Sequence, residues 1–372
     1  MSINNPFLSL RASERLLLRL IRQYSPSRAE LSQLSGLTPG AITQYCRKLL
    51  FLGLIKENEQ AVKKRGLQSF HLSLNQTACC SLGVTFLSDE FHLSIVDFCG
   101  NKMANQAYHY KSTTDLNMLL EQIKAAINQL LNKKFLTEAR ILGIGFSVSG
   151  YLTFDGSRSS PWFPLLQNQP NLTALFEQAL GYPCWIDNNI NTIAIGEYYS
   201  GKWNAINDIV VISLDFGIGA GVISQGKLIQ GGFGNAGEIG LLFAYGQPRP
   251  SWRDLVNRFD TPLEQNALVE RIKQQDPIVQ QWLADAKPKV LSLILSAIAW
   301  LDPKVIVLTG MLPASLIDEM IAFVRQSDEF QQFKDRPIAE LSTSQISVED
   351  IAIGAAILPI HCLLQEESVH SL

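Results

Sequence analysis

The first 75 residues place apolar side chains at helical spacing in three short segments. These segments predict helices over residues 11–23, 28–35 and 39–52. The apolar stripe of the first helix consists of Leu16, Leu17, Leu20 and Ile21. The side chains expected to pack the three helices together are Leu31, Leu34, Leu37, Ile42, Leu49 and Leu50. The pattern therefore predicts a small three-helix module at the start of the chain.

Turn signals between these segments predict a helix-turn-helix. Ser27 is a suitable N-cap for the second helix, with Glu30 in the capping-box position, and Gly36 ends that helix. Thr38 caps the third helix, and Pro39 occupies its first position. Two short helices joined by a glycine turn are typical of helix-turn-helix units, whose second helix enters the DNA major groove. The side chains expected to face that groove are Thr38, Gly40, Ala41, Thr43, Gln44 and Arg47.

A predicted hairpin, or wing, follows the three helices. It consists of an extended segment, a basic KKRG turn at residues 63–66 and an alternating strand over 70–74. The turn residues within reach of phosphates or the minor groove are Lys63, Lys64 and Arg65. Arg28, in the first turn of the second helix, is a further predicted DNA contact. The sequence thus predicts a winged helix-turn-helix DNA-binding domain over residues 1–75.

The charge distribution agrees with this prediction. Residues 1–75 hold eleven Lys or Arg and four Glu, a net charge of +7, whereas the whole chain carries −3, so the remainder carries −10. A small basic module on a large acidic body indicates a polyanionic partner for the module. The alternative is a packing module that binds no nucleic acid. Helix spacing, turn residues, the basic wing and local charge together favour DNA.

From residue 76 onward, strands alternate with helices. Strand pairs over about 82–97 and 209–224, each followed by helices, indicate two similar halves of an α/β architecture. We expect one two-lobed domain over 76–372. Lobe one covers about 76–190 plus the C-terminal helix, and lobe two covers about 191–348. With 372 residues, of which 47% are hydrophobic, the chain is too long and too apolar for a disordered protein.

Four segments of the body resemble a known family: LGIGFSVSGYL (142–152), IDNNINTIAIGEYYSG (186–201), GVISQGKLIQGGFGNAGEIG (221–240) and LDPKVIVLTG (301–310). In this order, and behind a winged helix, they resemble the ROK family of repressors and sugar kinases. The resemblance is to its repressor branch, with N-acetylglucosamine- and glucose-type repressors. It implies an actin-like, ribonuclease-H-like double domain that binds a monosaccharide between its lobes.

The resemblance also locates the catalytic base of the family's kinases, which lies in an Asn-Asp pair eight residues before a helical Glu. Counting back from Glu197 puts Asn189 at the aspartate position, preceded by Asn188. An amide can hydrogen-bond a sugar hydroxyl but cannot accept its proton near neutral pH. Asp187 is the remaining candidate base, because on an extended segment it would point along the same face with a displaced carboxylate.

Both phosphate loops of the kinases are altered as well. The family motif Asp-x-Gly-x-Thr corresponds here to residues 84–88, Val-Thr-Phe-Leu-Ser. The second loop, Gly-Thr-Gly in the kinases, is Asp-Phe-Gly at 215–217. A carboxylate and a bulky ring replace small residues that admit a polyanion. Together with Asn189, these changes predict a body that is not a kinase and binds no ATP.

The resemblance further implies a sugar-binding glutamate and a zinc site. Glu238 matches this glutamate. The next functional position of the family is a histidine that contacts sugar and zinc, and this chain has Leu241 there. The zinc-binding run C-x-C-G-x-x-G-C-x-E corresponds here to residues 245–254, which contain neither Cys nor His. Because a tetrahedral zinc needs about four such donors, we expect no zinc. Aligned from its far end, this loop places Asp254 at a second sugar-binding glutamate.

The predicted sugar-binding residues are Asn188, Asn189, Glu238, Asp254 and Trp162. Amides and carboxylates would bind hydroxyls, and the indole would lie under the apolar sugar face. Each of the last three has an alternative role. Glu238 could cap a helix or form a salt bridge, Trp162 could pack in the core or between lobes, and Asp254 could be a surface residue beside Arg253.

The sequence as a whole indicates a transcriptional regulator of carbohydrate metabolism, a repressor whose kinase-like domain is inactive and binds a sugar or sugar-phosphate effector. A homodimer or dimer of dimers would bind double-stranded operator DNA. No stretch approaches the roughly 18–20 apolar residues of a membrane span. The N-terminus is not typical of a secretory signal, and six scattered cysteines indicate a reduced, cytoplasmic chain.

Two other hypotheses stay open. An active ROK sugar kinase with a fused DNA-binding module would phosphorylate a hexose with ATP. A regulator that senses a partner protein would bind DNA yet gain no thermal stability from any monosaccharide.

Overall fold

The computed structural model of the protein describes residues 10–60, 69–87, 89–111, 115–132, 141–160, 163–167, 169–199, 201–203, 206–244, 246–261, 265–332 and 335–365. The chain divides into two compact units. The first comprises Met1–Ala205 and Glu349–Leu372, and the second comprises Ile206–Val348. The second unit therefore begins at 206, whereas the sequence places the start of lobe two near 191.

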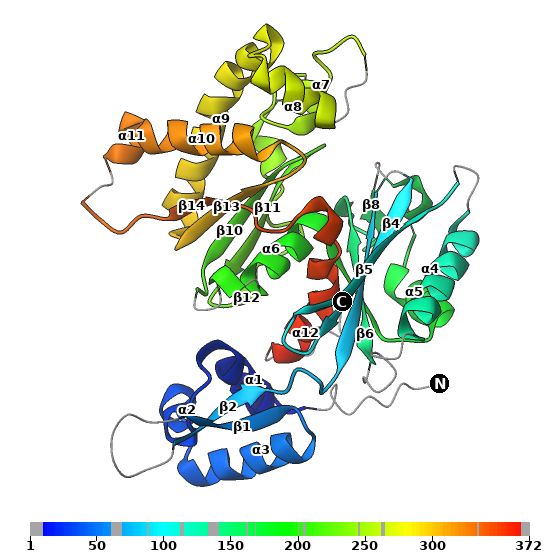
Figure 1. Ribbon diagram of the computed structural model, residues 1–372, viewed down its shortest axis with the longest axis vertical. Coiled ribbons are helices and arrows are strands. Elements are labelled where there is room, and N and C mark those ends of the chain that lie inside the picture. Colours follow the sequence, from blue (N-terminus) through cyan, green and yellow to red (C-terminus); the bar gives the residue numbers. More distant parts are fainter. Residues whose placement is uncertain are drawn as a thin grey trace. The chain divides into compact units, whose positions relative to one another are not determined.

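The N-terminal module consists of three helices followed by a two-stranded hairpin (Figure 1). Its elements are α1 (Ala12–Tyr24), α2 (Arg28–Ser35), α3 (Pro39–Phe51), β1 (Ile55–Gln60) and β2 (Ser69–Leu74). The two strands pair antiparallel, with Ile55 opposite Leu74 and Gln60 opposite Ser69. The three predicted helices and the hairpin are thus present. The predicted basic turn, with Lys63, Lys64 and Arg65, lies outside the described residues.

The core of the module differs from the predicted one at two helices. The buried apolar side chains of α1 to α3 are Leu17, Leu18, Ile21, Leu31, Ile42, Cys46 and Leu49. Leu34 was predicted to be in the core but is 46% exposed, because α2 buries a single residue, Leu31. In α1 the buried face is rotated toward Leu18, so Leu16 and Leu20 are only half-buried.

A five-stranded sheet forms the centre of the first unit after the module, in the order β5-β4-β3-β6-β9. Its strands are β3 (Cys80–Phe86), β4 (Glu90–Asp97), β5 (Lys102–His109), β6 (Ile141–Val148) and β9 (Cys184–Asn188). Strands β3, β4 and β5 are an antiparallel meander, whereas β6 runs parallel to both β3 and β9. The carboxyl ends of β3, β6 and β9 therefore meet at one edge, where α/β proteins commonly bind ligands.

Helices cover both faces of this sheet (Figure 1). On one face lie α4 (Leu116–Leu131) and α5 (Leu172–Leu180), which share an apolar core with the strands. The other face is covered by α12 (Ile353–Leu364), which contacts β3 and β6 and packs along α6 (Asn189–Tyr199). The smaller elements are β7 (Tyr151–Leu152), β8 (Arg158–Ser159), η3 (Pro164–Leu166), η4 (Gly201–Trp203) and η6 (Val348–Asp350).

The second unit is built on another five-stranded sheet, in the order β12-β11-β10-β13-β14. Its strands are β10 (Ile209–Leu214), β11 (Ile218–Ser224), β12 (Lys227–Leu228), β13 (Val305–Thr309) and β14 (Glu340–Thr343). Its helices are η5 (Ile239–Leu242), α7 (Trp252–Val256), α8 (Gln265–Lys273), α9 (Pro277–Leu301), α10 (Ala314–Gln326) and α11 (Asp328–Gln331). Side chains of α7, α9 and α10 share one apolar core with the strands.

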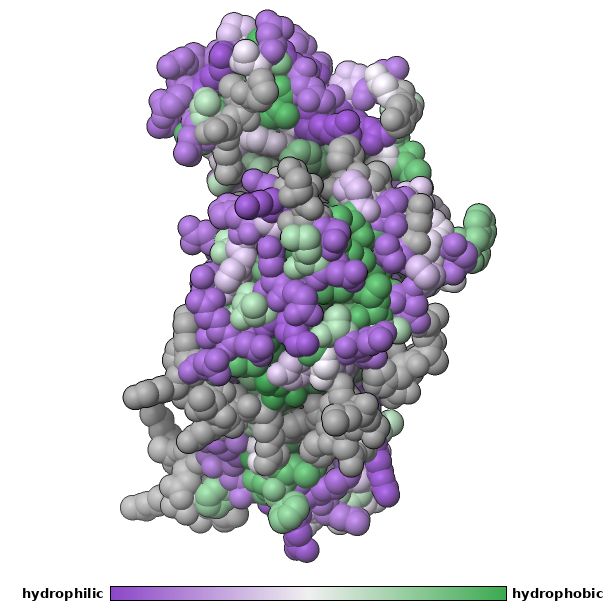
Figure 2. Space-filling view, turned by 90° about the vertical axis from the view of Figure 1, so that its right-hand side faces the viewer, coloured by the Kyte–Doolittle hydropathy of each residue, from purple (hydrophilic) through white to green (hydrophobic). Residues whose placement is uncertain are grey.

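Hydrophilic residues cover most of the coloured surface in Figure 2, with apolar residues between them, as expected of a folded domain. No helix within the described parts of the chain combines the length and apolarity needed to cross a bilayer. All six cysteines are free thiols.

Candidate functional sites

Capping interactions fix the two helices of the predicted helix-turn-helix. The Ser27 hydroxyl accepts a hydrogen bond from the Glu30 amide, and the Glu30 carboxylate accepts one from the Ser27 amide at 2.8 Å. Gly36 ends α2 in the left-handed conformation, at φ +69°. The Thr38 hydroxyl accepts from the Ala41 amide at 3.3 Å, which caps α3. The local sequence therefore sets where α3 begins.

One face of α3 is exposed and polar. The exposed predicted contact residues are Thr38, Gly40, Thr43, Gln44 and Arg47, and Ala41 is half-buried. A Cβ added at Gly40 would meet no atom within 4 Å, so the helix surface is open there. This face presents an amide and a guanidinium one turn apart, the donor and acceptor groups that read base edges.

Arg28 is held by the hairpin of its own module. Its Nη2 donates to Glu57 Oε1 at 2.7 Å, across from the first turn of α2 to β1. The two side chains are 40% and 34% exposed, so this is a surface ion pair that a phosphate could replace.

One cation of the module is buried and another is paired with a buried carboxylate, which the charge count of +7 could not reveal. Arg15 is 8% exposed, and its Nε donates to the Leu10 carbonyl at 3.0 Å. Lys48 binds the buried Glu14 carboxylate at 2.6 Å. The charge available to a polyanion is therefore smaller than the sequence indicates.

The predicted sugar-binding segment of the first unit lies at the turn from β9 into α6. Asp187, near the end of β9, is 7% exposed. Its carboxylate accepts from the Asn188 amide and from Asn191 Nδ2, both at 2.7 Å. A carboxylate in this position stabilises the N-terminus of α6. The expectation that Asp187 and Asn189 share an extended segment is wrong, because α6 begins at Asn189.

The two asparagines of this turn differ in their partners. Asn188 Nδ2 donates to the Gly150 carbonyl at 2.6 Å, and its Oδ1 accepts from the Ile190 amide at 3.0 Å. Asn188 thereby holds the loop after β6 and the start of α6. Asn189 is half-buried, and its side-chain amide makes no hydrogen bond to other described residues. Asn189 can therefore donate to and accept from a ligand hydroxyl without breaking a contact.

Glu238 lies in the second unit, just before η5. The segment is held against β11, because the Gly237 carbonyl accepts from the Ala220 amide at 2.8 Å. Gly237 has φ +90°, and a Cβ there would collide with the Ala220 carbonyl oxygen. Glu238 is half-buried beside this contact. The first glycine of the Gly-Glu-Ile-Gly motif thus allows the close packing on β11 that fixes the backbone position of Glu238.

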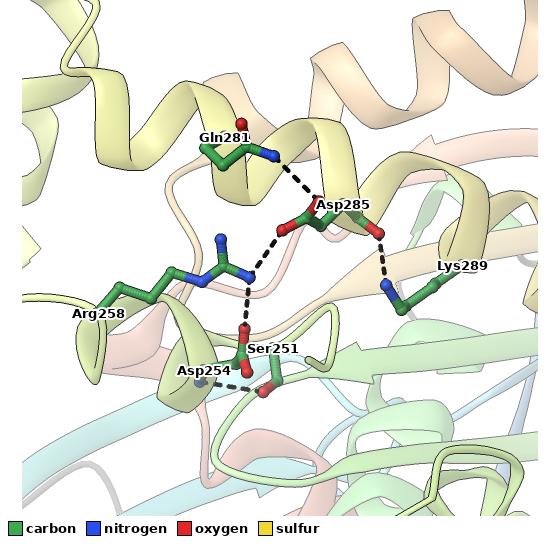
Figure 3. A network of polar contacts seen from close by, with 6 residues as sticks. All are labelled: Ser251, Asp254, Arg258, Gln281, Asp285 and Lys289. Atoms are coloured by element: carbon green, nitrogen blue, oxygen red, sulfur yellow. Dashed lines mark hydrogen bonds and ion pairs between the residues drawn. The ribbon is translucent and has the colours of Figure 1, made fainter. Parts of the chain in front are cut away.

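Asp254 belongs to a polar network on the surface of the second unit (Figure 3). Its carboxylate forms an ion pair with Arg258 at 3.5 Å, and Arg258 also binds Asp285 at 3.0 Å. The hydrogen bond from Arg258 holds the pKa of Asp285 below its usual range. Ser251 caps α7 by accepting from the Asp254 amide. Asp254 therefore has an internal partner, Arg258. Trp162 lies outside the described residues.

In the loop at residues 215–217, which corresponds to the second phosphate loop of the kinases, a backbone amide is hydrogen-bonded to a carboxylate of the same loop. Asp215 Oδ1 accepts from the Phe216 amide at 2.8 Å, which takes up an N–H of the kind that phosphate loops offer to their ligand. Burial raises the pKa of Asp215 to about 6. Phe216 is 49% exposed. At the first hairpin, Phe86 stacks on Phe163 with ring centroids 4.7 Å apart.

Comparison with known proteins shows which part of the chain resembles a known family. Residues 81–247 match the model of the ROK family. This part of the chain therefore resembles a ROK family domain. Uncharacterized protein y4fQ of Sinorhizobium fredii is 28% identical over 95% of this chain and 91% of its own length. The xylose repressor of Caldicellulosiruptor bescii is 28% identical over 58% of this chain. The dual regulator NagC of Escherichia coli is 26% identical over 60%. The chain spans 54% and 55% of the lengths of these two regulators.

Solved ROK structures share the mixed α/β fold. A ROK family transcriptional regulator, described as a homolog of the E. coli Mlc protein, has a TM-score of 0.73 over 95% of this chain and 97% of its own, at 18% identity. The ROK hexokinase of Thermus thermophilus has a TM-score of 0.60 over 75% of this chain and 97% of its own, at 21% identity. The fold alone is therefore common to regulators and kinases.

The segment that corresponds to the zinc-binding run of the ROK family differs from it in its side chains. Residues 241–254 contain neither Cys nor His. Within the described ranges, no three His, Cys, Asp or Glu side chains come together to hold a metal ion.

Proposed function

We propose that the protein is a DNA-binding transcriptional regulator of carbohydrate metabolism, a repressor whose ROK domain binds an effector without phosphorylating it. The observation that carries the proposal is the exposed polar face of α3 on a module with helix-turn-helix connections. The names of the relatives, a xylose repressor and a DNA-binding regulator, support it.

In this proposal the N-terminal module is a winged helix-turn-helix, and α3 is its recognition helix. Gln44 and Arg47 read base edges in the major groove, since an amide pairs with adenine and a guanidinium with guanine. Gly40 allows the helix to approach the DNA closely, and the hairpin β1–β2 contacts the backbone. Two subunits of a homodimer bind a palindromic operator with half-sites spaced by whole helical turns.

The effector is a sugar or sugar phosphate that binds Asn189. This residue is half-buried and its amide is not engaged by the other described residues, whereas Asn188 is committed to the turn. Glu238, in the second unit, is a separate candidate for binding a sugar hydroxyl. The effector changes operator affinity only as far as it prefers one conformation of the protein over another.

Two contacts support the proposed loss of phosphoryl transfer. The Asp187 carboxylate is buried and accepts two hydrogen bonds at the start of α6, so it is not aimed at a hydroxyl proton. The Phe216 amide donates to Asp215 instead of a phosphate oxygen. These contacts, with an amide at position 189, support an effector domain that needs neither ATP nor zinc.

DNA binding by point variants tests the recognition helix. Arg47→Ala and Gln44→Ala should each weaken operator binding by about ten- to a hundredfold and relax the sequence preference at one base pair. Lys124→Ala removes one charge from the exposed surface of α4 and is the matched control, expected to bind like the parent. If Arg47→Ala and Gln44→Ala both bind the operator as tightly as Lys124→Ala, α3 does not read the DNA.

Enzyme assays test the effector domain separately. The full chain is incubated with ATP, Mg²⁺ and a panel of hexoses, and product is measured. We expect none. Turnover that disappears in Asp187→Asn would establish the kinase instead. Thermal stabilisation by a monosaccharide, lost in Asn189→Ala, is expected for an effector site. A flat response to every sugar, with intact DNA binding, would favour a protein partner as the effector.

A further inference from the structure

Helix α1 of the N-terminal module is seated on aromatic rings of the first unit. The Arg22 guanidinium lies 3.9 Å from the ring centroid of Tyr199 and 4.7 Å from that of Tyr198. Its Nη2 atom is buried, and no described residue accepts a hydrogen bond from it. The faces of the two rings therefore supply the principal compensation for the buried part of this cation.

The groups that the first unit presents to Arg22 after residue 75 are aromatic, and a second cation of α1, Arg19, acts on the same groups. The ring of His361, on α12, lies 5.9 Å from that of Tyr199 in an edge-on arrangement. Burial, and then the charges of Arg22 and Arg19, lower the pKa of His361 to about 3, so its ring is neutral. Burial raises the pKa of Tyr199, which keeps its hydroxyl protonated. Arg22 thus brings a cation from the module to a neutral aromatic surface of the body.

Both tyrosines are at the end of the helix that begins at the candidate effector site. Helix α6 runs from Asn189 to Tyr199, a length of about 16 Å. It is packed tightly against α12, because a Cβ at Gly354 would collide with the Thr192 carbonyl oxygen. Closely packed helices shift together rather than deform. A displacement at Asn189 therefore reaches the tyrosines and α12.

We propose that Arg22, Tyr198 and Tyr199 form a docking joint, which holds the N-terminal module in one orientation on the rest of the first unit. The joint couples the site at Asn189 to the module. The inference rests on the proposed function in its use of DNA and an effector. Arg22 is a positioning residue: it does not touch DNA, but it sets where α3 is presented, and hence the half-site spacing that two subunits accept.

The covalent link between module and body leaves room for such control. Strand β2 ends at Leu74 and β3 begins at Cys80. Asn75 still belongs to the module, since its Nδ2 donates to the Gly53 carbonyl at 2.7 Å. The Gln76 carbonyl already accepts from the Phe98 amide at 3.3 Å, and Cys79 is buried, so the module pivots at Asn75 and Gln76 when the joint opens.

Operators with altered half-site spacing test the joint. The parent is expected to bind the preferred spacing about tenfold more tightly than one changed by about 5 bp, half a helical turn. Arg22→Met keeps the length of the side chain but loses its charge. In this variant we expect the preference to fall to about threefold or less, with affinity for a single half-site within about twofold of the parent.

Two control variants isolate the contact. Arg11→Met removes one charge from an exposed position at the start of the same helix and should keep the spacing preference. Tyr198→Phe keeps the ring and should also behave like the parent. Tyr199→Leu should reproduce Arg22→Met, and the double variant should be no worse than either single variant. If Tyr199→Leu does not fold, Arg22→Met decides alone.

Effector response is tested with N-acetylglucosamine and D-xylose, the sugars in the names of relatives. A sugar that weakens operator binding by the parent should have less effect on Arg22→Met than on Arg11→Met.

Hydrogen exchange provides a readout without DNA or sugar. Amides near the C-terminal end of α12 should exchange about tenfold faster in Arg22→Met than in Arg11→Met, because the module no longer covers them. If the parent binds no DNA, the proposed function fails, and this measurement alone decides on the joint. If Arg22→Met keeps both the spacing preference and the exchange protection of Arg11→Met, the joint does not exist.

Discussion

The buried imidazole of His361 makes the stability of the protein dependent on pH in a predictable way. Its side chain is 3% exposed at the end of α12, and its Nδ1 has no hydrogen-bond partner among the described residues. Burial is the main reason that its pKa falls from 6.5 to about 3, and the charges of Arg22 and Arg19 add to it. The unfolded chain accepts a proton near pH 6.5, whereas the folded chain does not until about pH 3.

The sign follows from this difference. The pKa of His361 is lowered in the folded state. The contribution of the neutral ring to the free energy of unfolding is therefore present in full above pH 6.5 and is lost as the pH falls toward 3. One pKa unit corresponds to about 1.4 kcal/mol, so the full difference is about 5 kcal/mol. At pH 5 the loss in the free energy of unfolding from this residue alone is about 2 kcal/mol.

Urea unfolding of the parent and of His361→Phe at pH 7, 6 and 5 measures this effect. Phenylalanine keeps a ring beside Tyr199 but does not titrate. Relative to the parent, the variant should gain about 2 kcal/mol in unfolding free energy between pH 7 and pH 5. His109→Gln is the matched control, since the His109 side chain is 79% exposed, and should show no comparable gain. If the difference between His361→Phe and the parent is the same at all three pH values, His361 is not buried as a neutral ring.

Three further substitutions have expected effects on stability. Asp215→Asn should raise the unfolding free energy at pH 7 by about 3 kcal/mol, because burial raises the pKa of Asp215 from 3.8 to about 6. The favourable contribution of the Asp215 carboxyl is present below pH 3.8 and is lost as the pH rises through 6. The gain should vanish near pH 3.5 in urea unfolding, and a constant gain would refute the cause. Gly354→Ala should cost about 1–3 kcal/mol through its collision with Thr192, whereas Gly217→Ala, where a methyl meets no atom within 4 Å, should leave the melting temperature nearly unchanged. Thr38→Ala should cost about 1 kcal/mol by removing the cap of α3, and equal melting temperatures would show that the cap contributes nothing.

Local signals in the sequence were sufficient to predict the elements whose ends or interiors they mark directly. Helix α2 was predicted over 28–35 and spans Arg28–Ser35, because Ser27 and Gly36 mark its two ends with specific backbone chemistry. Strand β6, Ile141–Val148, is likewise visible in the sequence, since a buried parallel strand is a nearly continuous apolar run.

Elements that depend on tertiary pairing carried no such signal. Strand β5, Lys102–His109, is mostly polar and exposed, and it is held at the sheet edge by its ladder with β4. Gly100 and Asn101 mark the turn before it, but no apolar alternation follows them. An edge strand of this kind can be found only once its neighbour is known.

The candidate site shows the same division. Counting eight residues back from Glu197 located Asn189 from the sequence alone. The count could not show that the Asn188 side chain is hydrogen-bonded to Gly150 and Ile190. It also could not show that Arg22, counted as part of a basic module, is seated on Tyr199, because these residues are far apart in the sequence. Side-chain commitments of this kind arise from packing and not from local pattern.

Selection of DNA from a random library by the full chain tests the central claim most directly. We predict enrichment of two half-sites related by a two-fold axis and separated by a whole number of helical turns, with Arg47→Ala losing the preference at one position of each half-site. Recovery of sequences no different from the starting library, under salt conditions in which non-specific binding is suppressed, would contradict a regulator that reads DNA through α3.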